Sequence, residues 1–123
     1  MLDHVSLGVS DLARAIGFYD AVLAALGYKQ VASSKHHTAY AENDEDRTFF
    51  IQHPVDRNPA EIGNGTHVCF QAHNQAEVEQ FHSEGIRTGG ADNGPPGPRY
   101  HDNYFAAFLL DPAGNRIEAV YIS

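Results

Sequence analysis

Residues 4–7 read His4-Val5-Ser6-Leu7, and 63 positions further along (67 − 4) residues 67–70 read His67-Val68-Cys69-Phe70. Phe18 recurs at the same offset as Phe81. Similarity at a fixed offset of about half the chain indicates two copies of one structural unit. The fold class is therefore predicted from the order of elements within each half.

The first half has the pattern of a strand, a helix and three further strands. Residues 2–9 alternate apolar and small polar side chains, which is typical of a half-buried strand. Apolar residues then recur at helical spacing over residues 12–26, after a capping residue at Ser10 or Asp11, and Gly27 is predicted to end the helix. Three more strands are predicted over 28–32, 37–41 and 47–52.

The second half repeats this order. A strand is predicted over 66–72, followed by a helix that begins at an Asn74–Glu77 capping box and ends at Gly85. Next come a short strand (86–88), a loop rich in glycine and proline (89–99), and two strands (103–110 and 116–122) around a turn. The sequence therefore predicts an α+β fold of two βαβββ modules.

The length of 123 residues suits one domain. We expect a first module over about 1–53, a linker over 54–64 and a second module over about 65–123. No apolar run is long enough for a membrane span, and the N-terminus lacks the pattern of a signal peptide.

The formal net charge is −8, which argues against nucleic acid and anionic membrane surfaces as partners. The single Cys69 excludes a disulfide framework within the chain and favours a reducing, cytoplasmic setting. The eight histidines stand out, because imidazole is the commonest metal ligand and the acid–base group of neutral pH.

Three stretches carry a family resemblance: Leu2 to Val9, Gly65 to Phe70, and Phe108-Leu109-Leu110-Asp111-Pro112-Ala113-Gly114-Asn115-Arg116-Ile117-Glu118. The chain resembles the vicinal oxygen chelate superfamily, which includes glyoxalase I, extradiol dioxygenases and bleomycin-resistance proteins. Residues 100–108 look like a subgroup of small bacterial glyoxalase-like members. The resemblance implies that paired modules form a curved sheet, or cup, around a divalent metal.

The resemblance also implies a ligand set of His4, His67 and Glu118. Strand alternation supports this set independently, because all three fall opposite the apolar face of their strands, on the side predicted to line the cup. Two imidazoles and one carboxylate leave coordination positions open for a substrate with two neighbouring oxygens or for dioxygen. The metal implied is Fe²⁺, Mn²⁺, Zn²⁺ or Ni²⁺.

The fourth strand departs from the glyoxalase I pattern. Residues 47–52 contain no acid, although glyoxalase I takes a further carboxylate ligand from this strand. The remaining His-His-Glu set is similar to that of extradiol dioxygenases.

Three further residues are candidates for catalysis. Tyr104 is a candidate proton donor, or a hydrogen-bond donor to a bound oxygen, with a core aromatic as the alternative. His101 follows the predicted loop, and His37 begins the third strand of the first half. Arg99 is predicted to meet a substrate carboxylate or to face solvent, and Cys69 to be a small buried thiol or part of the pocket lining.

Three functions follow as hypotheses. The first is a metal-dependent, glyoxalase-like lyase or isomerase that acts on a small molecule with vicinal oxygens. The second is a ring-cleaving dioxygenase of extradiol type with Fe²⁺ or Mn²⁺. The third is a non-catalytic drug-binding protein of bleomycin-resistance type. The resemblance implies a homodimer, in which the site is built within one chain or across two.

Overall fold

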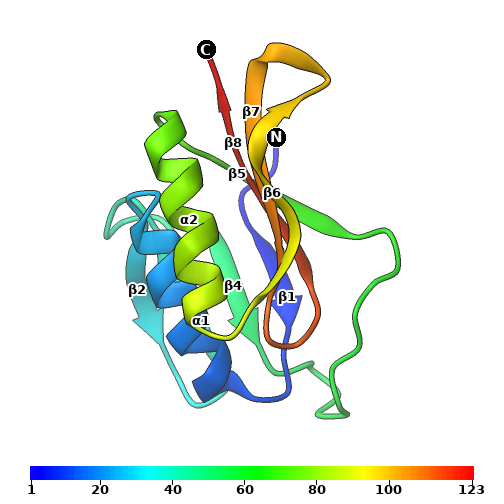
Figure 1. Ribbon diagram of the computed structural model, residues 1–123. Coiled ribbons are helices and arrows are strands. Elements are labelled where there is room, and N and C mark those ends of the chain that lie inside the picture. The colour runs from blue at the N-terminus through cyan, green and yellow to red at the C-terminus, as the bar shows by residue number, and fades with distance from the viewer.

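The computed structural model describes all of residues 1–123, which form two four-stranded sheets and two helices (Figure 1). Sheet 1 has the strand order β1-β4-β3-β2 and sheet 2 the order β5-β8-β7-β6. The elements are β1 (Val5–Gly8), α1 (Leu12–Ala24), β2 (Lys29–Ser33), β3 (His37–Ala41), β4 (Phe49–Gln52), β5 (His67–Gln71), α2 (Gln75–Arg87), β6 (Ala91–Arg99), β7 (His101–Leu110) and β8 (Arg116–Ile122). The predicted pair of βαβββ modules is confirmed.

The two sheets are built alike. In each, the first strand runs parallel to the last, and the remaining pairs are antiparallel. Figure 1 shows the helices side by side, and α1 and α2 are in contact. Neither helix is long and apolar enough to cross a bilayer.

Both helices begin at capping residues that the sequence analysis named as candidates. Asp11 is the N-cap of α1 and accepts a hydrogen bond from the Arg14 amide at 3.0 Å. Asn74 caps α2 by accepting from the Glu77 amide at 2.9 Å. The Glu77 carboxylate accepts from the amide of His73 rather than from that of Asn74, so the capping box is shifted back by one residue.

The predicted loop at residues 89–99 is wrong, because Ala91–Arg99 forms β6 and pairs with β7. The pairing is irregular, with register shifts after Asp92, Gly94 and Pro98. Proline has no amide hydrogen for a central ladder but is tolerated on an edge strand, and β6 is the edge of sheet 2. The high glycine and proline content of this segment therefore led to the incorrect prediction of a loop.

The predicted helix end at Gly85 and the short strand at 86–88 are also wrong, since α2 continues to Arg87. Gly85 is buried, and a Cβ atom there would clash with the Leu109 side chain. This glycine therefore allows α2 to pack closely on sheet 2. The prediction misread a glycine needed for packing as a helix terminator.

One hydrophobic core joins both modules. The apolar faces predicted for the strands all contribute to it, so the predicted alternation is confirmed; the residues are Val5, Leu7, Val9, Val68, Phe70, Ala72, Ile117, Ala119 and Tyr121. Phe49 of β4 meets Phe70 of β5 edge-on, with ring centroids 5.0 Å apart. The opposite faces of the two sheets, which we call the far faces, carry the candidate site residues.

Gly90 provides a test of this packing. A Cβ at Gly90 would lie 2.9 Å from the Leu110 carbonyl oxygen, 3.0 Å from the Gly85 carbonyl oxygen and against the Phe18 ring. Backbone atoms cannot move aside cheaply, so Gly90→Ala is expected to destabilise the fold by about 1–3 kcal/mol in urea unfolding. The matched control is Gly17→Ala within α1, which has no atom within 4 Å and should stabilise by about 0.5–1 kcal/mol. Equal effects of the two substitutions would contradict this account.

Candidate functional site

The far face of sheet 2 holds a buried carboxylate. Glu118 lies on β8 between Cys69 of β5 and Phe108 of β7, its partners in the strand register. Only 4% of its side chain is exposed. The Tyr104 hydroxyl donates to Glu118 Oε2 at 2.6 Å, and His67 Nε2 lies 3.1 Å from Oε1. The structure therefore brings together His67, Glu118 and Tyr104, three of the predicted residues.

Glu118 affects the titration of its neighbours. The hydrogen bond to Glu118, followed by partial burial, raises the pKa of the Tyr104 phenol well above its usual value. Cys69 is exposed as a residue, yet the protein around its sulfur and then the Glu118 charge raise the pKa of its thiol to about 12. At neutral pH both groups keep their protons and act as hydrogen-bond donors.

Cys69 should therefore react slowly with thiol reagents. A thiol with a pKa of about 12 has roughly a thousandfold less thiolate at pH 8 than an unperturbed cysteine. Iodoacetamide alkylation, followed by mass spectrometry, should be slower in the native protein than in urea by a comparable factor. Glu118→Gln should recover only part of this factor, since burial is the larger cause. Equal rates in native and unfolded protein would contradict the expectation.

Two more of the predicted histidines, His4 and His37, lie at sheet 1. His4 precedes β1, is exposed and contacts Asp3 at 2.8 Å between Nδ1 and Oδ2. His37 begins β3 and lies 2.8 Å from the Ser34 hydroxyl. Their rings lie 5.3 Å and 5.8 Å from that of Phe50, so both contact this aromatic residue.

Phe50 stands on β4 at the position where a further carboxylate ligand would be expected. It is the register partner of Ser6, just as Glu118 is the partner of Cys69, and Ser6 and Cys69 are 63 residues apart (69 − 6). Phe50 thus occupies in the first module the position that Glu118 occupies in the second. The repeat is symmetric in backbone but carries a carboxylate in only one half.

His101 and Arg99 lie at the junction of β6 and β7. The His101 ring is exposed and lies 5.8 Å from that of Tyr104, on the same strand. Arg99 is half-buried, with its guanidinium carbon 5.8 Å from the centre of the Phe108 ring. Both residues therefore border the far face of sheet 2.

Sheet 2 supplies two of the three side chains that a metal site would need, His67 and Glu118. Two ligands bound to one ion at about 2.0–2.2 Å are separated by about 3 Å when they occupy adjacent positions, and the His67 and Glu118 donor atoms are 3.1 Å apart. Tyr104 would orient the carboxylate as an outer hydrogen-bond donor. Within the single chain, however, no group of three or more His, Cys, Asp or Glu is arranged to hold an ion.

Two residues of this face were missed by the sequence interpretation. Arg116 is the register partner of His67, and its guanidinium carbon lies 4.3 Å from the centre of the Phe108 ring. The sequence could have placed Arg116 on this face, because it lies two positions before Glu118 and side chains alternate along a strand. Phe108 lies directly across from Glu118 in the register.

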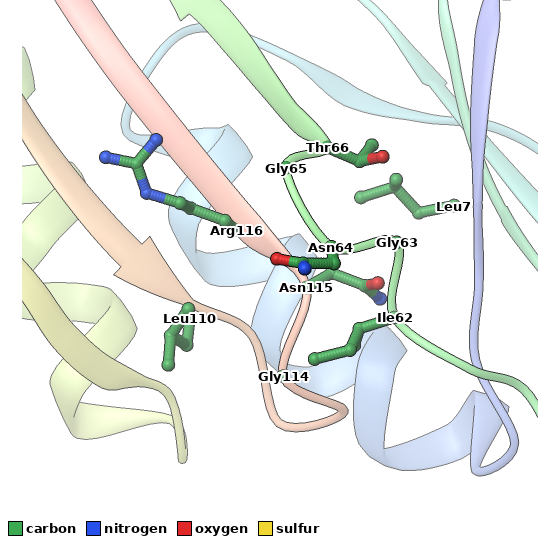
Figure 2. Close-up of a pocket in the computed structure, with 10 residues that line it drawn as sticks. All are labelled: Leu7, Ile62, Gly63, Asn64, Gly65, Thr66, Leu110, Gly114, Asn115 and Arg116. Carbon is green, nitrogen blue, oxygen red and sulfur yellow. The ribbon is translucent and has the colours of Figure 1, made fainter.

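A separate pocket of about 220 Å³ lies at the junction of the modules, between Leu7 of β1, the linker and the start of β8. Figure 2 shows the Arg116 guanidinium directed away from the other residues of this pocket. The pocket contains no histidine and no acid. We therefore locate the candidate chemistry on the far face of sheet 2 and not here.

The fold and this side-chain cluster define a two-module α+β protein with a buried carboxylate among imidazole, phenol and thiol groups. The chain belongs to the Glyoxalase/Bleomycin resistance protein/Dioxygenase superfamily, whose model matches residues 1–119. A search of curated proteins found no match.

Solved structures agree with this assignment. A glyoxalase/bleomycin resistance protein from Albidiferax ferrireducens T118 is 36% identical, with a TM-score of 0.89 over 100% of this chain and 99% of that chain. A glyoxalase-related enzyme from Fulvimarina pelagi is 18% identical, with a TM-score of 0.75 over 98% and 86%. The fosfomycin resistance protein FosX from Mesorhizobium loti is 19% identical, with a TM-score of 0.69 over 100% and 92%. The last two likenesses support the fold alone.

Proposed function

We propose that the protein is a metal-dependent, glyoxalase-like lyase or isomerase that acts on a small molecule with two neighbouring oxygens. The observation that carries the proposal is the 3.1 Å separation of His67 Nε2 and Glu118 Oε1 on the far face of sheet 2. A divalent ion held there would polarise the two substrate oxygens and favour loss of a proton from the adjacent carbon.

The protein groups around this pair have distinct roles in the proposal. Tyr104 keeps its proton at neutral pH and donates it in a hydrogen bond to Glu118 Oε2, so the carboxylate that would hold the ion is fixed in one orientation. His101, three residues before Tyr104 on β7, accepts the proton that leaves carbon.

The third ligand in the proposal is His4 of a second copy. One chain gathers only His67 and Glu118, while His4 and His37 lie together around Phe50 on sheet 1. A homodimer that sets sheet 1 of one copy against sheet 2 of the other would bring in both histidines at once. His37 then becomes a second candidate for the proton acceptor.

The absence of a carboxylate at Phe50 supports a second candidate, a dioxygenase of extradiol type. Two histidines and one carboxylate form the facial triad of non-haem iron(II) oxygenases. The metal distinguishes the two, since zinc or nickel suits proton transfer at carbon, whereas iron or manganese suits ring cleavage with dioxygen.

The deciding experiment is elemental analysis of protein purified without chelators or a histidine tag. We expect about one divalent ion per chain in the wild type and less than about a tenth of that in His67→Ala. The matched control is His73→Ala, because His73 makes a similar contact with Glu77 on the surface, at 3.0 Å. A folded wild type that takes up no ion, or equal metal in His67→Ala, would refute a metal-dependent enzyme and favour a non-catalytic binding protein.

Coexpression of His4→Ala with Glu118→Gln tests the two-chain site. Each variant alone should lose its metal. Random pairing makes about half of the dimers mixed, each with one complete site, so about a quarter of the metal should return. If both ligands belonged to one chain, none would return.

A further inference from the structure

The far face of sheet 2 carries two guanidinium groups around one aromatic ring. The Arg116 guanidinium carbon lies 4.3 Å from the centre of the Phe108 ring, and that of Arg99 lies 5.8 Å from it. The two charges are therefore at most about 10 Å apart, because both distances end at the same ring. Phe108 is itself only 6% exposed, so it provides a fixed base for them.

Arg116 is held in place without a neutralising partner. Its Nε donates to the side-chain oxygen of Asn93 at 2.7 Å, and its terminal nitrogens donate to no protein atom. Contact with Phe108 further fixes the plane of the guanidinium. A group positioned in this way loses little conformational freedom when it binds a ligand.

Arg99 has fewer free N–H groups for a ligand than Arg116. Its terminal nitrogens donate to the carbonyl oxygens of Pro95 and Pro98. Asp92 is the acid near it: the pKa of Asp92 is lowered first by the Gly94 amide, then by His82, and to a smaller extent by Arg99. Neither arginine forms an ion pair. Arg116 is therefore the principal contact and Arg99 adds long-range attraction.

The position of Arg116 relates it to the proposed reaction. It is the direct register partner of His67, and it precedes Glu118 by two residues on the same face, about 6.6 Å along the strand. A small substrate bound at His67 and Glu118 would thus extend over Arg116. The Glu118 charge repels an anion at its own position, but Glu118 lies two residues from Arg116 along the strand.

We propose that Arg116 binds a carboxylate of the substrate, so that the substrate is a small oxygenated carboxylic acid. The planar fork of free terminal N–H groups matches the two oxygens of a carboxylate. This inference rests on the proposed function for the position of the reacting oxygens, but the anion site itself belongs to the metal-free chain.

The test uses metal-free protein, so that its result is independent of the metal measurement. Pyruvate, its neutral analogue pyruvamide and inorganic phosphate are titrated into ¹⁵N-labelled protein at constant ionic strength. We expect saturable shifts at Asn93, Gly94 and Arg116 with pyruvate and none with pyruvamide. Arg116→Ala should weaken pyruvate binding about tenfold or more, and Arg116→Lys less than that.

Arg87→Ala is the matched control, because Arg87 lies on α2 and is paired with Glu84. It should bind pyruvate as the wild type does. Equal binding of pyruvate and pyruvamide, or wild-type binding in folded Arg116→Ala and Arg116→Lys, would overturn the proposal. Tighter binding of phosphate than of pyruvate would also overturn it, in favour of a phosphorylated ligand. Loss of metal binding alone would refute the proposed function and leave this site intact.

Discussion

Glu118→Gln is expected to lower metal affinity by at least about a hundredfold while the chain stays folded. The substitution keeps the size of the side chain, and the amide oxygen still accepts a hydrogen bond from Tyr104. It removes the negative charge and turns one oxygen into a donor, which cannot bind an ion. Changes to residues that merely support a ligand already cost about 10–100-fold in affinity, so loss of a ligand should cost more.

Competition with a fluorescent chelator measures the affinity, and circular dichroism checks the fold. Glu77→Gln is the matched control, since Glu77 also lies 3.0 Å from a histidine but on the surface of α2. It should bind metal as the wild type does. Wild-type affinity in a folded Glu118→Gln variant would remove Glu118 from the site.

Asp111→Ala is expected to cause the largest loss of stability, about 3–5 kcal/mol. Asp111 is 3% exposed and accepts four hydrogen bonds: from the Tyr19 hydroxyl at 2.7 Å, the Ala113 amide at 2.9 Å, and the amide and side chain of Asn115 at 2.8 and 3.1 Å. Asn115 in turn donates to the Gly8 carbonyl at 3.1 Å. The carboxylate therefore joins the turn before β8 to α1 and β1 of the other module.

Thermal and urea unfolding measure this effect, and we expect the melting temperature to fall by more than about 10 °C. Tyr19→Phe removes a single donor and should cost about 1–2 kcal/mol. Glu45→Ala, at an exposed turn, is the control and should leave stability unchanged. An Asp111→Ala variant within about 1 kcal/mol of the wild type would contradict this role.

The same contact predicts how stability changes at high pH. Burial, followed by the charge of Asp111, raises the pKa of Tyr19 well above its usual value. The folded chain keeps this proton, whereas the unfolded chain releases it near pH 10. The stabilisation is therefore complete below about pH 10 and declines as pH rises further. Tyr19→Phe should make unfolding less sensitive to pH above 10.

Local patterns predicted much of this molecule. Alternation along β1, β5 and β8 placed His67 and Glu118 on one face because side chains in a strand alternate strictly. Prediction from local sequence failed where contacts between distant residues decide the structure. Gly85 lies within α2 because Leu109 packs on it, not at the end of the helix. Residues 91–99 form the strand β6 because β7 pairs with them. The separation of His4 from the other two residues depends on how the modules pack, which no local pattern encodes.

The proline-rich strand β6 also limits how copies of this chain can associate. An exposed strand edge normally offers amide hydrogens to which another chain can add. On β6, Pro95, Pro96 and Pro98 offer none, and the register shifts distort the remaining stretch. This rim of sheet 2 is thus closed to strand addition, so a second copy must approach through a sheet face or through the edge at β1, β2 or β5. The composition of one edge therefore prevents stacking of further strands on β6 while leaving the far faces free to meet.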